Sequence, residues 1–421
     1  METLQVVEIV SRIITAPETM IDARYDPKYF TRNRAMSFVQ LLYFLLNPAK
    51  ECLQIRLNRF YRTLREHGIS IPQLPISQQA LSKARSHFDH SPFEKMTRSL
   101  VEEEYSGRHP LERWNGYLVA AVDGSSAVLP HAPQLKVEFG VSGCESARAT
   151  AGISVLYDVL NNWILDASIG SYPMNERSLA KEHVRVLRES AIPFGDLLLL
   201  FDRGYPSEDF LTHLQQQGVK YLMRCQKSWL SQVEAAPQGD SVCTLKNGVK
   251  IRVYKFLLPS GQEERLVTNL YDTPSQEFPS LYFLRWGVEG GYDVVKNKVA
   301  LEDFSGCTKN AIFQDFWATI TLTNIAANAH GEADELVQAK CAEKNNTRSQ
   351  APNVSQLVGS LKDTFIFICL LTPIQQRSAA INVLIREIAR SIVLIRPDRP
   401  PRKRSKAPKK KQYPMNRKSN I

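Results

Sequence analysis

The spacing of hydrophobic positions changes along the chain, and the first hundred residues show the 3.6-residue period of helices. A helix is expected over about 49–67, where an arginine also recurs at every third position. Ser77 can cap a short helix over 78–88 that carries two basic residues. We therefore predict a helical DNA-binding domain over residues 1–110. The alternative is that these basic residues form only a solvated face of packed helices.

From Tyr117 onward the apolar residues form short runs, which are typical of buried strands. The run Tyr117–Val122 ends at Asp123, and the fully apolar run Leu197–Phe201 ends at Asp202. A strand without polar positions is expected at the centre of a sheet. The other elements predicted in this part are a hairpin of strands at 151–157 and 163–169, a helix over 176–190 and a helix capped by Ser207.

Downstream of residue 218 the sequence predicts a meander of strands and then helices. A helix carrying Glu289 is expected over about 275–300, although Gly290 and Gly291 each cost about 1 kcal/mol inside a helix relative to Ala. That cost indicates a close approach of another backbone or of a substrate, or a local break. Further helices are expected over 309–330, 354–371 and 374–395, with a polar loop over 331–353.

These patterns divide the chain into consecutive parts with an α/β core in the middle. The predicted parts are a helical DNA-binding domain (1–110), the first part of the core (111–218), a β-strand insertion (219–275), the second part of the core with the Glu289 helix (276–330), C-terminal helices (331–395) and a basic tail (396–421).

Two apolar strands thus each deliver an aspartate at the carboxyl end. Ligands of open α/β sheets bind outside those ends, so Asp123 and Asp202 are neighbours if their strands lie side by side. A hard cation between two carboxylates would cancel their repulsion. The alternative for either aspartate alone is a turn or helix-cap residue.

The segment from Tyr282 to Lys296 carries the third candidate acid. Its gaps of three, four and seven residues keep Tyr282, Arg285, Glu289 and Lys296 near one face of a helix. A carboxylate beside two cations and a phenol suits a site that holds a divalent metal and a phosphate together.

Charge is concentrated at the end of the chain. The net charge is +10, and residues 396–421 hold 11 bases and one acid, which leaves 53 − 11 = 42 bases and 43 − 1 = 42 acids elsewhere. Such a tail is typical of a disordered nucleic-acid-binding arm, and the alternative is a solubilising or disordered end without that role. The seven scattered cysteines indicate a reducing cytosol, and we expect neither a signal peptide nor a membrane span.

Over about 115–330 the chain resembles a DDE transposase of bacterial insertion sequences, in the family named after insertion sequence four. The residues that carry the resemblance are Asp123 in AVDGSS, Asp202 in FDRGY, the Tyr282, Arg285, Glu289 and Lys296 signature, and the flanking LRWGVE, LEDFSG and LVTNL. Many relatives have a second acid where this chain has Gly290.

The resemblance implies an RNase H-like fold with a mixed sheet flanked by helices, interrupted by the β-rich insertion. It implies two Mg²⁺ or Mn²⁺ ions held by Asp123, Asp202 and Glu289 as catalytic and metal-binding residues, with Tyr282, Arg285 and Lys296 binding DNA. It also implies cut-and-paste transposition through a hairpin intermediate, with a homodimer on paired terminal inverted repeats and target DNA, in the bacterial cytoplasm.

Two other functions stay open. One is a catalytically retired or repurposed DNA-binding protein that keeps the fold, and the other is a different RNase H-like nuclease. Three converging acids disfavour the retired protein, because it has no chemical use for them. Inverted repeats on both sides of the coding region would favour transposition over both alternatives.

Overall fold

The computed structural model describes residues 1–32, 34–48, 51–69, 71–72, 74–142, 148–227, 229–258, 260–299, 301–344, 348–371 and 373–395. The predicted basic tail over 396–421 lies outside the described residues. The chain forms two compact units, which we call the helical unit and the sheet unit. The helical unit contains Met1–Leu100, Leu129–Leu135 and the described residues from Val294 onward, and the sheet unit contains Val101–Val128 and Lys136–Asp293.

The helical unit is built mainly from α-helices of both ends of the chain. Its helices are α1 (Thr3–Thr15), α2 (Pro17–Ala23), α3 (Phe38–Leu45), α4 (Leu53–Glu66), α5 (Gln78–Arg85), α6 (Ser91–Glu104, which ends in the sheet unit), α13 (Lys309–Glu343), α14 (Val354–Leu370) and α15 (Ile374–Ile388). The polar loop predicted over 331–353 is wrong at its start, because α13 continues to Glu343. Ala333 and Val337 are buried on this extension, so its polar residues belong to the exposed face of a helix. The last predicted helix is also too long: Ile392–Leu394 form strand β11, which pairs with β10 (Gln350–Pro352). No described helix has the length and hydrophobicity needed to cross a membrane.

Two arginines of the predicted DNA-binding helices hold the helical unit together. Arg56 on α4 is 6% exposed and donates a 2.7 Å hydrogen bond to the backbone oxygen of Asn47. Arg85 on α5 is 3% exposed and forms a 2.8 Å ion pair with Asp315. These buried guanidinium groups are paired inside the unit and are not presented to DNA. The DNA-binding role of the first 110 residues stays a prediction.

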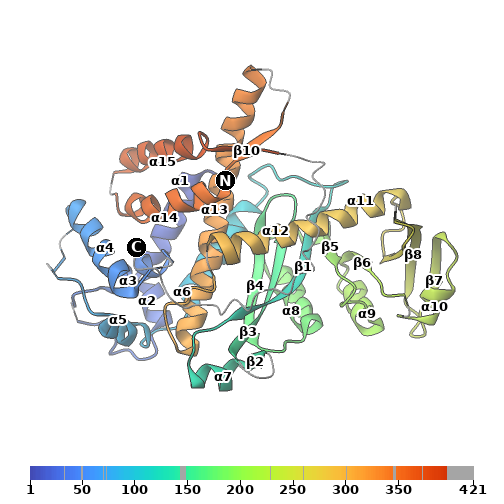
Figure 1. Ribbon diagram of the computed structural model, residues 1–421, viewed down its shortest axis with the longest axis horizontal. Helices are drawn as coiled ribbons and strands as arrows, with labels where there is room; N and C mark the ends of the chain where they lie inside the picture. Colours follow the sequence, from blue (N-terminus) through green and yellow to red (C-terminus); the bar gives the residue numbers. More distant parts are fainter. Residues whose placement is uncertain are drawn as a thin grey trace. The chain divides into compact units, whose positions relative to one another are not determined.

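The sheet unit contains a mixed sheet with nine strands in the described residues (Figure 1). The path of hydrogen-bonded strands is β2-β3-β1-β5-β6-β9-β8-β7. β4 also pairs with β3, on the side opposite β1. Within it, β1 runs antiparallel to β3 and parallel to β5, and β5 runs parallel to β6. The order β4-β3-β1-β5-β6 with these directions is that of an RNase H-like core, so the predicted fold class is confirmed. The strands are β1 (Leu118–Val128), β2 (Val141–Ser142), β3 (Arg148–Asp158), β4 (Trp163–Ser171), β5 (Leu197–Phe201), β6 (Lys220–Arg224), β7 (Gly239–Thr244), β8 (Lys250–Leu257) and β9 (Glu263–Thr268).

The strands of the predicted β-rich insertion extend this sheet. β9 pairs antiparallel with β6, and β8 and β7 follow it outward. Short helices and 3-10 turns fill the connections, namely α7 (Pro133–Phe139), which begins in the helical unit, η1 (Phe194–Asp196) and α10 (Ser231–Ala235). The site at the edge of the core therefore shares a continuous hydrogen-bonded sheet with the inserted strands.

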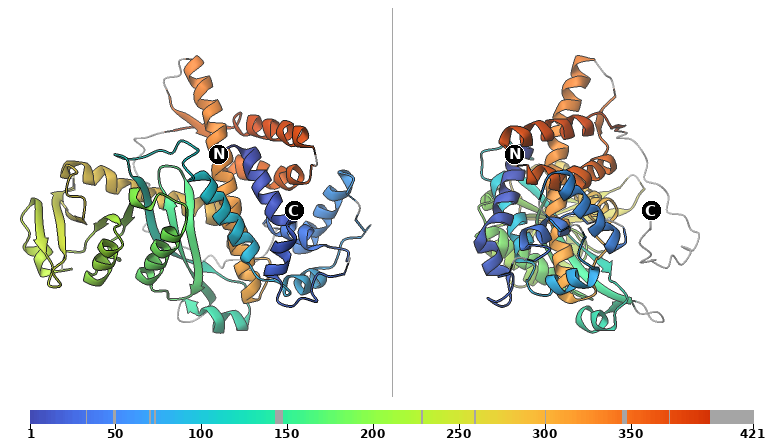
Figure 2. Two further views of the ribbon diagram at one scale, coloured as in Figure 1. Left: turned by 180° about the vertical axis from the view of Figure 1, so that it is seen from behind. Right: turned by 90° about the vertical axis from the view of Figure 1, so that its left-hand side faces the viewer.

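Helices cover both faces of the core sheet (Figures 1 and 2). One face carries α8 (Glu176–Glu189) and α9 (Glu208–Gln216), and the Nε2 atom of His183 on α8 lies 2.9 Å from the hydroxyl of Ser154 on β3. The other face carries α12 (Gly287–Asp293), which packs on Tyr157 of the same strand. Because side chains alternate along β3, Ser154 and Tyr157 point to opposite faces.

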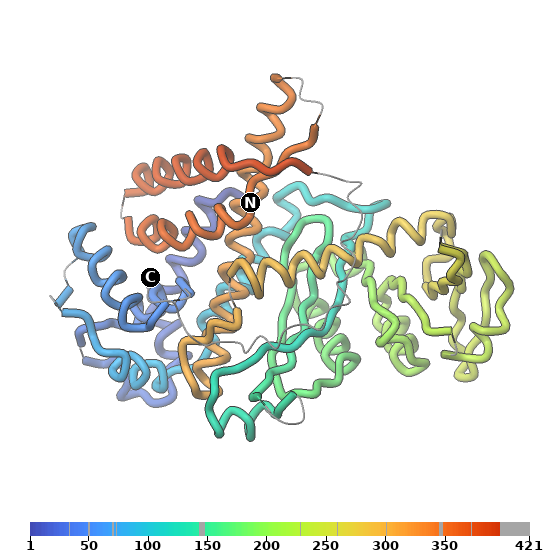
Figure 3. The backbone as a smooth tube through the Cα atoms, in the orientation of Figure 1, coloured from blue at the N-terminus to red at the C-terminus, as the bar shows by residue number. Residues whose placement is uncertain are grey.

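The segment expected as one helix over 275–300 is helical but irregular. It consists of η2 (Ser275–Glu277), α11 (Phe278–Phe283), η3 (Leu284–Trp286), α12 (Gly287–Asp293) and the π-helical turn η4 (Val294–Lys298), and Figure 3 traces its path to Asp293 in yellow and gold. A Cβ atom added at Gly291 would lie 2.9 Å from the Tyr157 ring, whereas one at Gly290 would meet nothing within 4 Å. The neighbour of Gly291 is thus a side chain and not the expected backbone, while the expected approach of a substrate stays a prediction.

Candidate active site

Asp123 and Asp202 lie beside each other at one edge of the parallel part of the sheet. The parallel pairing of β1 with β5 ends at Val122 and Phe201, and each aspartate is the next residue of its strand path. The two carboxylates interact electrostatically. The sheet thus brings together two acids that are 79 residues apart in the sequence, as 202 − 123 shows.

The prediction that the first strand ends at Asp123 is wrong. β1 continues to Val128, because residues 123–128 remain paired with β3 after the partner on the other side, β5, has ended. Asp123 pairs with Val155, and Val128 pairs with Thr150. Asp123 is therefore held by regular antiparallel pairing on one side, while its other side faces the open end of β5.

The environment of the Asp123 carboxyl group disfavours its charged form. Burial raises its pKa to about 6, and the neighbouring carboxylates of Asp202 and Glu176 act in the same direction. Arg285 and the backbone N–H of Gly124, which donates a 3.0 Å hydrogen bond to Asp123 Oδ1, act in the opposite direction. Two acids and a partly compensating cation form a site that a further cation would stabilise.

Three members of the predicted signature lie in the sheet unit near this pair. The hydroxyl of Tyr282 donates a 3.4 Å hydrogen bond to Asp202 Oδ1, and burial raises the pKa of this phenol. Arg285 is 4% exposed, and its Nη2 atom lies 3.9 Å from Glu289 Oε1. The side chain of Glu289 is 55% exposed. Lys296 lies on η4 and belongs to the helical unit, so its part in the site stays a prediction.

Two further residues of the site were missed by sequence reasoning. Glu176 is the first residue of α8, and its carboxylate lies so close to Gly124 that a Cβ atom there would be 2.6 Å from Glu176 Oε1. Tyr205 follows Asp202 by three residues, and its buried hydroxyl has no hydrogen-bond partner within the described residues. Burial, followed by the charges of Glu176, Asp123 and Asp202, raises the pKa of Tyr205. The glycine at position 124 was the available signal, since it leaves room for Glu176, whereas a Cβ atom at Gly204 would make an ordinary 3.7 Å contact with Glu176.

Tyr292 connects the signature segment with β1. Its hydroxyl donates a 2.7 Å hydrogen bond to the backbone oxygen of Asp123. Together with the contact between Gly291 and Tyr157, this bond fixes α12 on the sheet face that carries Asp123. The position of Arg285 and Glu289 relative to the aspartates therefore depends on both contacts.

The donor set fits a hard divalent cation in type, because carboxylate oxygens are the ligands such ions prefer. Asp123 and Asp202 present adjacent, partly buried carboxylates, and the attraction of Arg285 does not offset the cost of burying Asp123. Among the described residues, however, no three acidic, histidine or cysteine side chains are arranged as a complete metal site. Asp123 and Asp202 would hold an ion, and Glu289 would have to turn its exposed side chain inward to join them.

Comparison with known proteins places the site within a family. Residues 114–325, just over half of the chain, match the family model described as Transposase DDE domain. The chain is 24% identical over 159 residues to the putative transposase InsZ of Escherichia coli (strain K12), covering 37% of this chain and 49% of that protein. It is 25% identical over 136 residues to the probable transposase for insertion sequence element IS5377 of Geobacillus stearothermophilus, covering 29% of this chain and 36% of that protein. The matches thus span about half or less of the length of these curated relatives.

Among solved structures, the chain is similar to one described as a cryo-EM structure of piggyBac transposase synaptic complex with hairpin DNA. The TM-score is 0.45 at 10% sequence identity, with 90% of this chain and 85% of that chain covered. The family model spans both aspartates, Glu176 and the signature through Lys296. This chain belongs to the Transposase DDE domain family.

Proposed function

We propose that the chain is a transposase of the insertion-sequence-four type, which cuts the ends of an insertion sequence and joins them to target DNA. The reaction class is phosphoryl transfer assisted by two Mg²⁺ or Mn²⁺ ions, carried out on DNA in the bacterial cytoplasm. The observation that supports this proposal best is the adjacent pair Asp123 and Asp202, since it lies on an RNase H-like sheet in a chain of this family.

In this proposal Asp123, Asp202 and Glu289 hold the divalent ions. Bound ions of this kind lower the pKa of an attacking water and stabilise the leaving 3′ oxygen. The chain itself positions the scissile phosphate. Arg285 suits this role because its guanidinium is buried beside the aspartates and its Nε has no acceptor within the described residues. The single O–H of Tyr282 donates to Asp202, and it would turn from Asp202 to donate to a neighbouring phosphate oxygen.

The later steps of the proposed reaction reuse the same residues. The freed 3′ hydroxyl attacks the opposite strand to form a hairpin, which is reopened and joined to target DNA. Each step is an in-line displacement at phosphorus, so no covalent enzyme intermediate is required, and Ser125 and Ser126 are not nucleophiles. Two ends must be paired before joining, so we propose a homodimer on two terminal inverted repeats. Lys296 is proposed to hold the 5′ strand during hairpin formation.

The test is cleavage of DNA that carries the ends of the element. We expect Asp123→Asn, Asp202→Asn and Glu289→Gln each to reduce Mg²⁺-dependent nicking by at least a hundredfold and to leave binding of the ends within a fewfold of wild type. The reason is that removal of one ligand charge disables metal binding, whereas DNA affinity comes mainly from phosphate contacts.

Asp209→Asn is the matched control, because Asp209 is an exposed acid of the same unit that pairs with Lys181 on the surface. This variant should nick like wild type. If any of the three site variants keeps activity within tenfold of wild type, its assignment as a metal ligand is wrong. Binding by wild type without any metal-dependent nicking would support the retired DNA-binding protein, and nicking without dependence on element ends would support another nuclease.

A further inference from the structure

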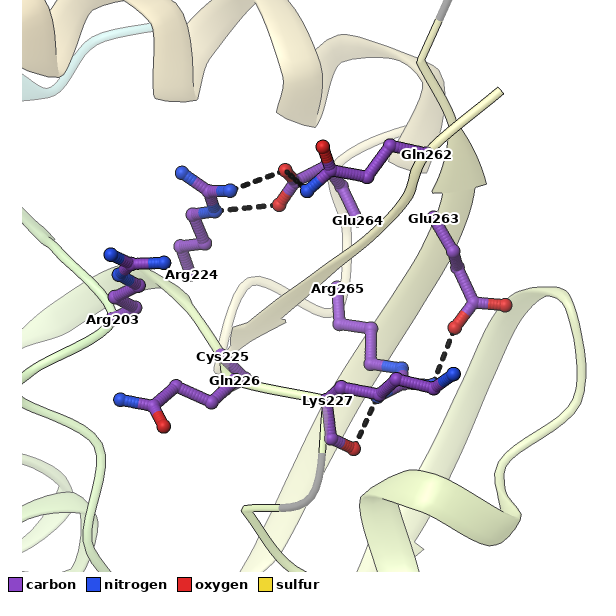
Figure 4. Close-up of a pocket in the computed structure, with 9 residues that line it drawn as sticks. All are labelled: Arg203, Arg224, Cys225, Gln226, Lys227, Gln262, Glu263, Glu264 and Arg265. Carbon is purple, nitrogen blue, oxygen red and sulfur yellow. Dashed lines mark hydrogen bonds and ion pairs between the residues drawn. The ribbon is translucent and has the colours of Figure 1, made fainter. Parts of the chain in front are cut away.

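A cavity of about 760 Å³ lies next to the candidate active site, at the ends of β6 and β9 in the sheet unit (Figure 4). Most of its lining side chains are charged or carry amide groups, and none of the lining residues is aromatic. They are Arg203, Arg224, Cys225, Gln226, Lys227, Gln262, Glu263, Glu264 and Arg265. A site without an aromatic platform is poorly suited to stacking bases, whereas cations and amides are suited to phosphate oxygens.

The strand register places this cavity directly beside the carboxylate pair. β5 pairs in parallel with β6 up to Phe201 and Met223, so the next residues, Asp202 and Arg224, continue the row that contains Asp123. Arg203 follows Asp202 in the chain and lines the cavity. The edge of the sheet therefore changes from acidic at β1 and β5 to basic at β6.

The charges that line the cavity leave two cations uncompensated. Arg224 Nε donates a 2.6 Å hydrogen bond to Glu264, and Arg265 forms a 2.5 Å ion pair with Glu263, as Figure 4 shows. Arg203 and Lys227 are exposed, and within the described residues neither has an acidic side chain at ion-pair distance. With both acids of the lining already paired, these two side chains are free to bind an anion.

Arg224 and Arg265 are each held in place by more than one contact. Arg224 is held by both carboxylate oxygens of Glu264, and Arg265 also donates to the backbone oxygen of Lys227. The charge of Arg224 also favours the ionised form of the Tyr282 phenol, and Tyr282 is hydrogen-bonded to Asp202. A continuous row of groups thus leads from the aspartates through Tyr282 and Arg224 into the cavity.

We propose that this cavity binds backbone phosphates of the DNA strand whose scissile phosphate lies at Asp123 and Asp202, with Arg203 and Lys227 as the principal contacts. The proposal rests on the proposed transposase function. It assigns the cavity to the phosphodiester groups of that strand and not to its bases, because the cavity provides cations and amides but no aromatic base platform. Gln226 and Gln262 can add hydrogen bonds to phosphate oxygens.

The test uses the double variant Arg203→Gln/Lys227→Gln, which removes both free cations and leaves the two ion pairs intact. The probe is a fluorescent DNA hairpin with single-stranded flanks, and its dissociation constant is measured over a range of salt concentrations. Two lost phosphate contacts on a single strand should reduce the slope of log K against log salt by about 1.4. Affinity at moderate salt should fall by about tenfold.

The matched control is Lys246→Gln/Lys250→Gln. Both lysines are exposed, and their substitution removes the same charge from the same unit. Lys246 lies in the turn that precedes β8, and Lys250 begins that strand. The cavity lies beyond the other end of β8, where Leu257 pairs with Glu263. The control should change the slope by less than half as much.

An unchanged slope in the Arg203→Gln/Lys227→Gln variant, or an equal loss in the control, would overturn the cavity assignment. Metal-dependent nicking by the wild-type chain, measured in parallel, separates this result from failure of the proposed function. If wild type does not nick but the cavity variant loses its slope, the cavity stands as a DNA site and the transposase proposal fails. If wild type nicks and the slope is unchanged, only the cavity proposal fails.

Discussion

At the scale of single residues, Asp123 lowers the stability of the metal-free fold at a position where it is proposed to bind a metal ion. Its carboxyl group is partly buried beside Asp202 and Glu176, while Arg285 and one backbone N–H favour its charged form. An acid in such a place destabilises the folded chain when it is ionised and no cation is bound. A bound divalent ion would reverse this destabilisation, because the ion attracts the ionised carboxylate and not the protonated acid.

This arrangement predicts a pH-dependent stability difference in the metal-free protein. The pKa of Asp123 is about 6 in the folded chain and lower when unfolded, so the folded state binds more protons between about pH 4 and 6. The stability contributed by protonated Asp123 is therefore lost as pH rises through about 6. At pH 7.5 we expect Asp123→Asn to unfold with a free energy on the order of 2 kcal/mol higher than wild type, and at pH 4 with little difference.

Urea denaturation at both pH values, with and without Mg²⁺, measures this difference. Mg²⁺ should raise the stability of wild type at pH 7.5 and not that of Asp123→Asn. Asp209→Asn serves as the control, since its partner Lys181 lowers the pKa of Asp209 on an exposed surface. A difference between wild type and Asp123→Asn that does not depend on pH would show that burial of Asp123 carries no electrostatic cost.

At the scale of elements, the two adjacent glycines of α12 differ in whether packing requires a small residue. Gly291 faces β3, where a methyl group would enter the ring of Tyr157, and Gly287 is similarly close to Val159, at 3.2 Å. Gly290 has open space beside it. Glycine spacing of four residues thus lets one face of α12 approach the sheet closely and helps to set the distance between Arg285 and the aspartates.

The glycine pair provides an internal comparison. Gly291→Ala should lower the free energy of unfolding by about 1–3 kcal/mol, because the added methyl group overpacks against Tyr157. Gly290→Ala should raise it by up to about 1 kcal/mol through helix propensity. Denaturant unfolding of both variants tests this expectation. Equal effects of the two substitutions would contradict the close packing of α12 on β3.

At the scale of the whole molecule, the distribution of charge separates general DNA affinity from chemistry. The excess of positive charge lies in residues 396–421, outside the described residues, while the remainder of the chain is neutral overall. Long-range attraction to DNA is thus expected to come from the tail. Local patches, such as the cavity beside Asp202, would instead position particular phosphates.

Deletion of residues 396–421 tests this division. We expect non-specific DNA binding at moderate salt to weaken by at least tenfold and its salt dependence to become shallower, because 11 bases are lost. Metal-dependent nicking at low salt should persist. A chain in which the tail's bases are replaced by glutamine keeps the length and should behave like the deletion. Unchanged binding in both chains would identify the tail as a solubilising end.

The sequence by itself determined where the core strands and most of the helices lie and which acids follow the apolar strands. This is because hydrophobic periodicity, turn residues and caps act over a few residues. Ser77 and Ser207 cap helices as predicted, and the helix predicted from residue 176 begins at Glu176. It failed where a local signal was ambiguous: Asp123-Gly124 looks like a turn, yet pairing with β3 keeps it in a strand.

Only the tertiary structure decided what meets at the site. The register of β1, β5 and β6 sets Asp123 beside Asp202 and Arg224, and the docking of α8 brings Glu176 to Gly124. These neighbours come from distant parts of the sequence, and a shift of one residue in register would turn each side chain to the other face. Pairing between strands is a property of the folded sheet, so the acidic site and the basic cavity beside it emerge only after folding.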